Sequence, residues 1–291
     1  MKKILALTAV AALLLVTSCA GKKKAPACEN IVVPAHDNVP EYTIVNAPQV
    51  DLASFPIDED GYYVIFNGKD FTGWRGYGKE GVPSKWVIED GALKFEGKGG
   101  GEAQKGDGGD IIFTKKLKNF ILEFEWKVAK RANSGVFYLA QEITTTKPDG
   151  SVKYEHIYLS APEYQILDNA NHPDALLGVN GNRQSASLYD MIPAVPQNAK
   201  PFGEWNTGRI LVFQGTVVHG QNGENVLEYH LWTPEWTEML QASKFSHDKW
   251  PIAFDLLNDC GGPNHEGYIG FQDHGDVVWY RNIRVKLLDE E

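Results

Sequence analysis

The chain has 291 residues, 43% of them hydrophobic, which is enough for a domain with a sizeable core. Its net charge of −10 argues against nucleic acid or an anionic membrane surface as the main partner. Eight Trp, twelve Tyr and 29 Gly indicate a β-rich, turn-rich protein with aromatic side chains available to stack on sugar rings.

The first residues have the pattern of an export signal. Met1-Lys2-Lys3 is basic, and residues 4–16 form an apolar run too short for a stable membrane span. Val16-Thr17-Ser18-Cys19 resembles a bacterial lipobox, which implies cleavage before Cys19 and lipidation of that cysteine. An ordinary signal peptide with an incidental cysteine is the alternative. Because residues 20–24 read Ala-Gly-Lys-Lys-Lys, with no acidic residue, we expect an outer-membrane lipid anchor that faces the periplasm.

Two cysteines, Cys28 and Cys260, remain once Cys19 is assigned to the anchor. They can pair in an oxidising compartment, but the sequence says nothing of their geometry. No zinc-type cysteine spacing is present.

The domain boundaries follow from composition. Residues 1–18 are predicted to be the signal peptide, and 19–58 a proline-containing tether with little periodicity, part of which can lie against the domain. Residues 59–291 are predicted to form one folded domain. No internal repeat and no second domain is evident in the sequence.

Short runs rich in Val, Ile, Phe, Trp and Tyr fill this domain, with turn signals such as Asn222-Gly223 between them. Residues 121–128 alternate polar and apolar side chains, as a half-buried antiparallel strand does. The predicted strands are 62–65, 86–89, 92–95, 110–114, 120–128, 135–140, 163–167, 209–214, 217–219, 226–232, 268–273 and 277–288. One short helix is expected over 234–243, where proline occupies the first turn. The pattern predicts an all-β sandwich of two sheets, one with a concave face.

The stretch Glu163–Asp168 (EYQILD) stands out within this pattern. As a strand it places Glu163, Gln165 and Leu167 on one face, and Tyr164, Ile166 and Asp168 on the other. A carboxylate beside an amide in an otherwise buried run costs free energy unless both are hydrogen-bonded. The stretch is therefore either an edge strand with a solvated face or the floor of a cleft that binds a polar ligand.

Several ordered motifs then resemble one family. The segment 65–74 (IFNGKDFTGW) resembles the opening of the 3-keto-disaccharide hydrolase domain, long catalogued as a domain of unknown function. Further motifs of this domain match 86–93 (WVIEDGAL), 133–136 (NSGV), 163–168 (EYQILD), 200–206 (KPFGEWN), 219–223 (HGQNG), 269–275 (IGFQDHG) and 280–285 (YRNIRV). Together they cover roughly residues 60–288.

The resemblance implies a concanavalin A-like β-sandwich (jelly roll) that acts on 3-keto-glycosides. It also implies cleavage by hydrolysis or by elimination, in which a 3-keto group acidifies the hydrogen on C2 and the enolate expels the aglycone from C1. Such chemistry requires a base near C2, a positive or hydrogen-bonding group at the keto oxygen, and an acid at the leaving oxygen. An upstream oxidoreductase that makes the 3-keto sugar is implied by the substrate class alone.

The resemblance suggests roles for individual residues. Glu163 or His219 is the candidate base, and His274 or His219 the candidate acid, although His219 can also be a core histidine. The candidate substrate-binding residues are Asn133, Gln165, Trp205, Asn206 and Arg281. A divalent cation is the alternative to Arg281 at the enolate. Asp168 and Asp273, together with His274, are candidate metal ligands or a strand-bracing cluster.

The sequence departs from the family pattern in places. An Arg often follows the Asn-Ser-Gly motif in the family, whereas Gly135 here leads into Val136-Phe137-Tyr138-Leu139. The segment 141–160 is long, and 258–266 contains Cys260 within additional residues.

Two other functions compete with the resemblance. A non-catalytic carbohydrate-binding lipoprotein is one, because lectins use this fold and fold alone does not decide function. A retaining glycosidase would need two carboxylates about 5 Å apart. We rank it last, since Gln165 and Leu167 share the strand face of Glu163.

Overall fold

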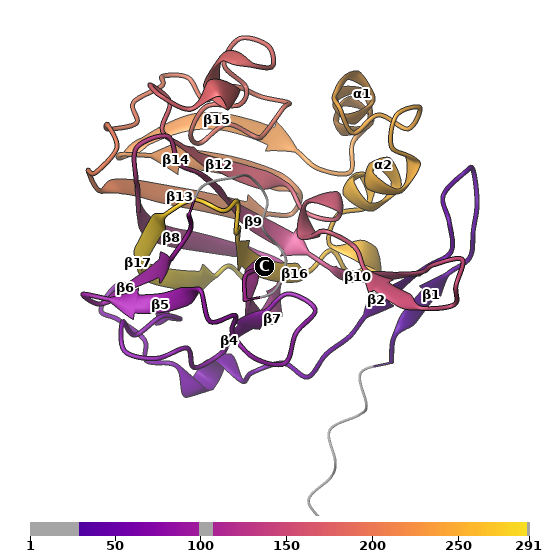
Figure 1. The fold of residues 1–291 in the computed structure, drawn as a ribbon, viewed down its shortest axis with the longest axis horizontal. Coiled ribbons are helices and arrows are strands. Elements are labelled where there is room, and N and C mark those ends of the chain that lie inside the picture. The colour runs from indigo at the N-terminus through magenta and orange to yellow at the C-terminus, as the bar shows by residue number, and fades with distance from the viewer. Residues whose placement is uncertain (1–28, 99–106, 290–291) are drawn as a thin grey trace, which may run out of the picture.

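Two antiparallel β-sheets pack face to face in the computed structural model, which describes residues 29–98 and 107–289 (Figure 1). The larger sheet has the order β15-β14-β13-β8-β17-β6-β5, with β3 beside β17. Its strands are β3 (Tyr63–Val64), β5 (Trp86–Glu89), β6 (Ala92–Phe95), β8 (Phe120–Val128), β13 (Asn206–Phe213), β14 (Thr216–Gln221), β15 (Glu224–His230) and β17 (Val278–Leu287).

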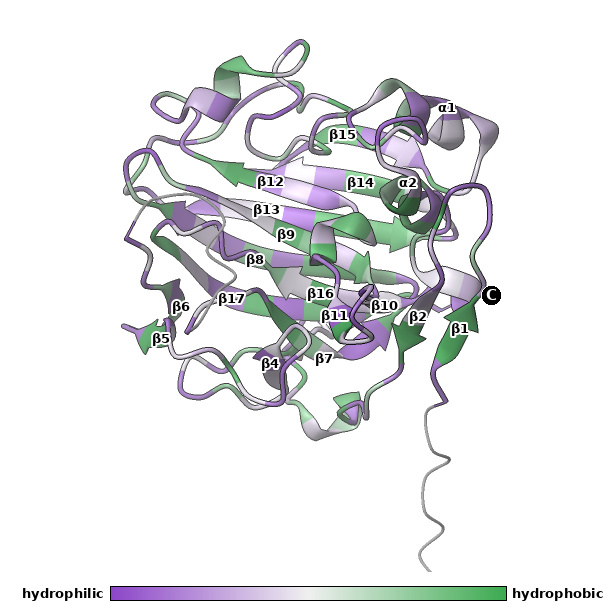
Figure 2. Cartoon of the chain, turned by 45° about the vertical axis from the view of Figure 1, so that its right-hand side comes forward, coloured by the Kyte–Doolittle hydropathy of each residue, from purple (hydrophilic) through white to green (hydrophobic). Residues whose placement is uncertain are grey.

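The smaller sheet has the order β12-β9-β16-β7-β4. Its strands are β4 (Trp74–Gly76), β7 (Ile111–Leu117), β9 (Asn133–Ala140), β12 (Glu163–Leu167) and β16 (Gly267–Phe271). Alternate side chains of both sheets meet in the core: the Phe124 ring of β8 lies edge-on to Tyr164 at 5.5 Å and to Phe271 at 6.4 Å. Figure 2 shows the corresponding hydrophilic and hydrophobic bands along the strands. The predicted β-sandwich is confirmed.

A third, four-stranded sheet lies beside the sandwich (Figure 1). It consists of β1 (Ile31–Val33), β2 (Tyr42–Val45), β10 (Glu142–Thr146) and β11 (Val152–Tyr154). Part of the predicted tether 19–58 is therefore folded, since β2 pairs with β10 and places Ile44 opposite Ile143. This pairing joins segments about a hundred residues apart, which explains why so short a run did not read as a strand.

Two helices lie at one side of the sandwich, α1 (Pro234–Ala242) and α2 (Pro251–Asn258). The predicted helix over 234–243 is confirmed: Thr233 accepts a hydrogen bond from the Trp236 N–H and caps its start. Helix α2 was not predicted. Short 3-10 turns cover 52–54, 157–159, 173–176 and 262–264. In the described part of the chain, no helix is long and apolar enough to cross a membrane.

The cysteine predictions concern Cys19, Cys28 and Cys260. Cys260 is buried, and burial raises the pKa of its thiol. Its proposed partner Cys28 lies outside the described residues, as do the signal peptide 1–18 and the predicted anchor Cys19.

A buried ion pair connects the sandwich to the four-stranded sheet. Arg75 of β4 donates to both carboxylate oxygens of Glu142 in β10, at 2.6 and 2.7 Å. Glu142 also accepts the Gly78 N–H and is 1% exposed. Such a bidentate pair holds two groups in one geometry, and removing one partner leaves the other charge buried and unpaired.

We therefore expect Glu142→Gln to lower the free energy of unfolding by about 3 kcal/mol, measured by urea denaturation. The control is Glu89→Gln, which removes the exposed ion pair with Lys94 and should change stability by less than about 1 kcal/mol. Equal effects of the two substitutions would contradict the structural importance of the Arg75–Glu142 pair.

Candidate active site

Glu163 and Gln165 lie on the outer face of the smaller sheet, away from the sandwich core. Strand β12 is an edge strand that pairs with β9, with Glu163 opposite Phe137 and Gln165 opposite Gly135. Gly135 makes room for the carboxylate, because a Cβ there would lie 2.2 Å from Glu163 Oε1. Both polar side chains are almost fully buried. The stretch 163–168 therefore contains an edge strand, but its polar face is covered and not solvated. Of the two interpretations of this stretch, the floor of a cleft fits the structure.

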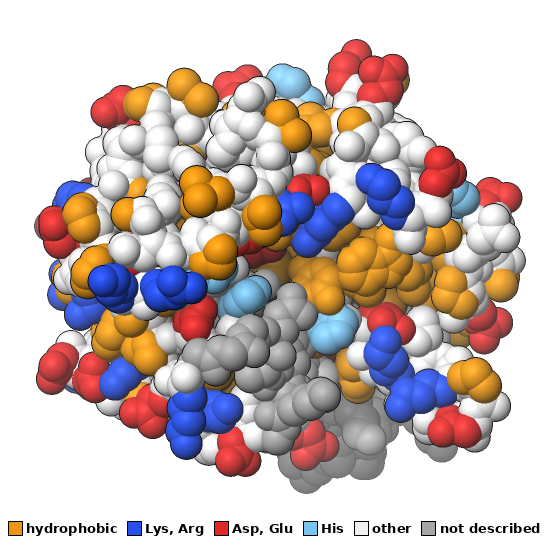
Figure 3. Space-filling view, turned by 45° about the horizontal axis from the view of Figure 1, so that its top comes forward, with side chains coloured by type: hydrophobic (Ala, Val, Ile, Leu, Met, Phe, Trp, Pro, Cys, Tyr) orange, Lys and Arg blue, Asp and Glu red, His pale blue; other side chains and the backbone are white. Residues whose placement is uncertain are grey.

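A narrow pocket of about 90 Å³ opens over this face. One side is aromatic: the Trp250 ring stacks at 6.3 Å on Phe245 and lies edge-on to Tyr158 at 5.9 Å. The lining residues are Asn133, Tyr158, Glu163, Gln165, Tyr189, Lys244, Phe245, Trp250, Gln272 and His274. Figure 3 shows hydrophobic, basic and histidine side chains gathered around the hollow of this face. The pocket therefore combines an apolar wall with several polar groups, as ligand sites do.

Three buried polar atoms of the pocket residues have no hydrogen-bond partner among the described residues. They are Asn133 Oδ1, Gln272 Oε1 and His274 Nδ1. The other polar atoms of Asn133 and His274 face each other, with Asn133 Nδ2 3.4 Å from His274 Nε2. Leaving a buried donor or acceptor unpaired costs about 1–3 kcal/mol, so three in one pocket indicate that bound water or a polar ligand completes their hydrogen bonds.

Lys244 supplies a cationic group to the same pocket. Burial lowers the pKa of its ammonium, and the nearby negative charge of Glu163 opposes that shift. The ammonium lies 4.4 Å from the centre of the Tyr189 ring. The sequence did not indicate Lys244, because it lies between α1 and α2 in a segment without motif or periodicity.

His219 is in the core and does not line the pocket. Its Nδ1 lies 2.9 Å from the Ala186 carbonyl oxygen and its Nε2 2.8 Å from the Tyr138 hydroxyl. Since a carbonyl only accepts, Nδ1 carries the proton and Nε2 accepts from Tyr138. Burial lowers the pKa of the ring to about 4. Of the three candidate catalytic residues, the fold brings together Glu163 and His274, and it gives His219 a structural position.

Three candidate substrate-binding residues do not line the pocket: Asn206 and Arg281 lie on strands of the larger sheet, and Trp205 directly precedes β13. The Arg281 guanidinium stacks 4.0 Å above the Trp205 ring and donates to Glu125 at 2.7 Å. Asn206 is 1% exposed and accepts the Lys200 N–H through Oδ1. Asn133 and Gln165 are thus the two members of that set that reach the pocket.

Asp168 and Asp273 brace loops at the ends of the strands. Asp168 accepts from the Arg131 N–H and from Asn171 Nδ2. Asp273 accepts from the N–H groups of Gly109 and Gly275. In the part of the chain that the structure describes, no three metal-ligating side chains stand together. The bracing alternative fits their contacts.

Comparison with known proteins decides the family. The model of a family described as the 3-keto-alpha-glucoside-1,2-lyase-like domain matches residues 61–286. The chain belongs to this family. A relative from Bacteroides thetaiotaomicron, named 3-keto-disaccharide hydrolase, is 66% identical over 272 residues, which are 94% of each chain. The resemblance that the motifs indicated is confirmed.

Solved structures share the fold of this family member. The crystal structure of a proposed glycosyl hydrolase from Parabacteroides distasonis is 29% identical, with a TM-score of 0.63 over 80% of this chain and 99% of that one. A second structure from the same organism is 24% identical, with a TM-score of 0.53 over 77% and 98% of the two chains.

Burial of His219 in its neutral form should make the stability of the protein depend on pH. Its pKa falls from 6.5 to about 4 on folding, so the unfolded chain binds an additional proton between these values and stability is lost as the pH falls through this range. We expect the difference in unfolding free energy between wild type and His219→Phe to shrink by about 3 kcal/mol from pH 8 to pH 4. Urea titrations at each pH measure it.

The control is Leu176→Ala, at an exposed position whose side chain carries no titratable group, for which the difference should stay nearly constant. A difference for His219→Phe that is independent of pH would show that this ring is not buried in its neutral form.

Proposed function

We propose that this protein cleaves 3-keto-glycosides, with Glu163 removing the proton on C2 of the oxidised sugar. The observation that carries the proposal is the pocket in which Glu163 and Lys244 stand beside three unpaired polar atoms. The name of the 66% identical relative supports the substrate class. That name supports cleavage of a glycoside, and elimination is the mechanism that we propose for it.

The proposed reaction has three steps: proton abstraction, expulsion of the aglycone and addition of water. Glu163 takes the C2 proton, and the electrons of that bond form an enolate whose oxygen is the former 3-keto oxygen. The ammonium of Lys244 stabilises this negative charge, because opposite charges attract more strongly in a partly buried pocket than in water. The enolate then re-forms the ketone and expels the oxygen at C1, which takes a proton from His274. Water adds to the resulting double bond and yields the free 3-keto sugar.

The remaining pocket residues bind and orient the sugar. Asn133, Gln165 and Gln272 offer amide groups for sugar hydroxyls, and the unpaired oxygens of Asn133 and Gln272 accept hydrogen bonds. Trp250 supplies an apolar surface for the ring. Each hydroxyl that is bound satisfies a group that is otherwise buried without a partner, which favours an oxidised glycoside with its other hydroxyls intact.

The cellular setting belongs to the proposal. The N-terminal pattern supports a lipid anchor at Cys19 in the outer membrane, facing the periplasm, where an oxidoreductase must first oxidise C3 of the glycoside. A divalent cation near the enolate stays a prediction. The proposed steps proceed without it, and a chelator tests whether activity needs a cation.

The experiment uses an aryl 3-keto-glucoside and the matching unoxidised glucoside, with phenol release as the readout. We expect cleavage of the keto compound alone, and a loss of kcat of at least about 100-fold in Glu163→Gln, since a general base contributes about 10²–10⁴. Parallel reactions with a chelator report any need for a cation.

The matched control is Glu228→Gln on the exposed face of β15, which should keep full turnover. Wild-type turnover by Glu163→Gln would contradict the assignment of the base. Saturable glycan binding by folded wild type, without product from either compound, would instead support a carbohydrate-binding protein.

A further inference from the structure

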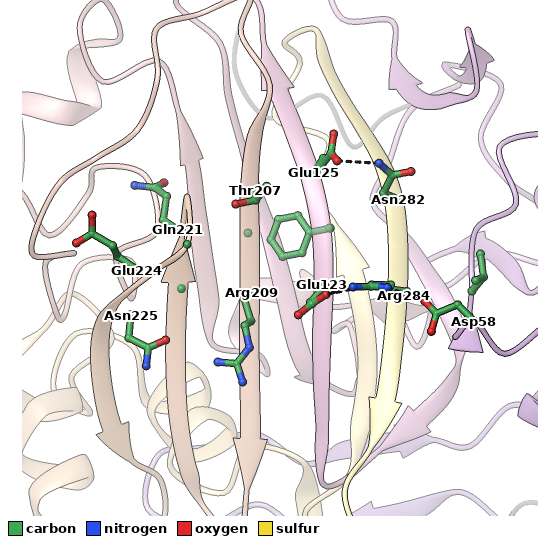
Figure 4. Close-up of a pocket in the computed structure, with 15 residues that line it drawn as sticks. Asp58, Glu123, Glu125, Thr207, Arg209, Gln221, Glu224, Asn225, Asn282 and Arg284 are labelled. Carbon is green, nitrogen blue, oxygen red and sulfur yellow. Dashed lines mark hydrogen bonds and ion pairs between the residues drawn. The ribbon is translucent and has the colours of Figure 1, made fainter. Parts of the chain in front are cut away.

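The outer face of the larger sheet contains a second, wider depression, which we call the β8–β13 trough. It has a volume of about 600 Å³, and its floor is formed by Glu123 and Glu125 of β8 and by Thr207 and Arg209 of β13 (Figure 4). The sandwich core separates it from the pocket at Glu163, which lies on the outer face of the other sheet. Its volume falls in the range of small-molecule sites.

The two sides of the trough come from different parts of the chain. Glu224 and Asn225, at the start of β15, line one side, and Asp58 and Val64 line the other. Figure 4 shows Glu224 and Asn225 on one side of Arg209, and Arg284 and Asp58 on the other. The depression therefore runs across β14, β13, β8 and β17.

Both carboxylates of the floor are held in place by neighbours. Glu123 accepts from Arg284 at 2.8 Å and from the Tyr62 hydroxyl at 3.1 Å. Glu125 accepts from Arg281 and from Asn282, both at 2.7 Å. Their side-chain oxygens are thus fixed acceptors, since each has lost much of its freedom before any ligand arrives.

Arg209 is the exception. It stands opposite Glu123 on one side and Gly220 on the other, yet its guanidinium makes no hydrogen bond or ion pair to any described residue. Glu123 is turned toward Arg284 instead. Gly220 leaves space beside it, because a Cβ there would lie 3.2 Å from Arg209 Cβ. A partly buried guanidinium with five free donors is available to a ligand.

The lining identifies the chemistry of that ligand. The trough contains four acids, Asp58, Glu123, Glu125 and Glu224, and two arginines, Arg209 and Arg284. The net charge of the lining is −2 (four negative and two positive side chains), which disfavours an acidic ligand. The described residues here form no metal-binding cluster. The carboxylates of Glu123 and Glu125 accept hydrogen bonds, and the Arg209 guanidinium donates them. A ligand with hydroxyl groups fits both, because a hydroxyl donates and accepts.

We propose that the β8–β13 trough is a second, non-catalytic site that binds a short neutral oligosaccharide, with Arg209 as its central donor. The site would hold a glycan on the face opposite the catalytic pocket. The proposal rests on the lining of the trough and not on the reaction assigned to Glu163, so either can fail alone.

The test measures binding of maltotriose, cellotriose and laminaritriose by saturation-transfer NMR and calorimetry, with trigalacturonate as the acidic counterpart. Glu163→Gln protein serves as the background, so that turnover does not interfere. We expect at least one neutral trisaccharide to bind, Arg209→Met to weaken it at least tenfold, and the melting temperature to stay unchanged because no ion pair is lost.

The control Lys147→Met removes an exposed positive charge far from the trough in sequence and should leave binding unchanged. The proposal is overturned if none of the three neutral trisaccharides binds, if only trigalacturonate binds, or if Arg209→Met binds as tightly as its parent. In the last case the ligand occupies another surface.

Discussion

The register between β12 and β9 determines which side chains enter the core and which enter the pocket. Gln165 lies opposite Gly135, and Tyr164 lies opposite Val136. A slip of one residue would turn Glu163 into the core and Tyr164 out of it, because successive side chains of a strand face opposite ways. The core contact of Tyr164 with Phe124 therefore fixes the direction of the Glu163 carboxylate.

The hydrogen-bonded network around His219 stabilises this register from the core side of β12. The His219 ring lies 4.8 Å from the Tyr164 ring, and Tyr138 bonds both to His219 and to Tyr229. The Tyr164 hydroxyl donates to the Gly220 carbonyl of β14, so β12 is tied to the larger sheet. A buried polar network with every member paired specifies one packing arrangement, and this one positions the strand that carries Glu163.

Alternation along the chain was sufficient to predict most strands and to place Glu163 on one strand face with Gln165, because each depends on local periodicity. The position of His219 was not predictable in this way. The Asn222-Gly223 turn after it suggested a site at the end of a sheet. Side chains two residues apart on a strand share a face, however, so His219 points into the core with Val217. Lys244 and the β2–β10 pairing depend on which distant segments meet, and a single sequence holds no periodic signal for such contacts.

The most direct test of the role of Glu163 is a single-turnover reaction with an aryl 3-keto-glucoside deuterated at C2. If the C2 bond breaks before the aglycone leaves, phenol release is slower than from the undeuterated compound, and the 3-keto product carries hydrogen from water at C2. An incubation without enzyme corrects for spontaneous exchange next to the ketone. Equal rates, with deuterium retained at C2 of the product, would contradict proton abstraction by Glu163 and would point to direct hydrolysis at C1.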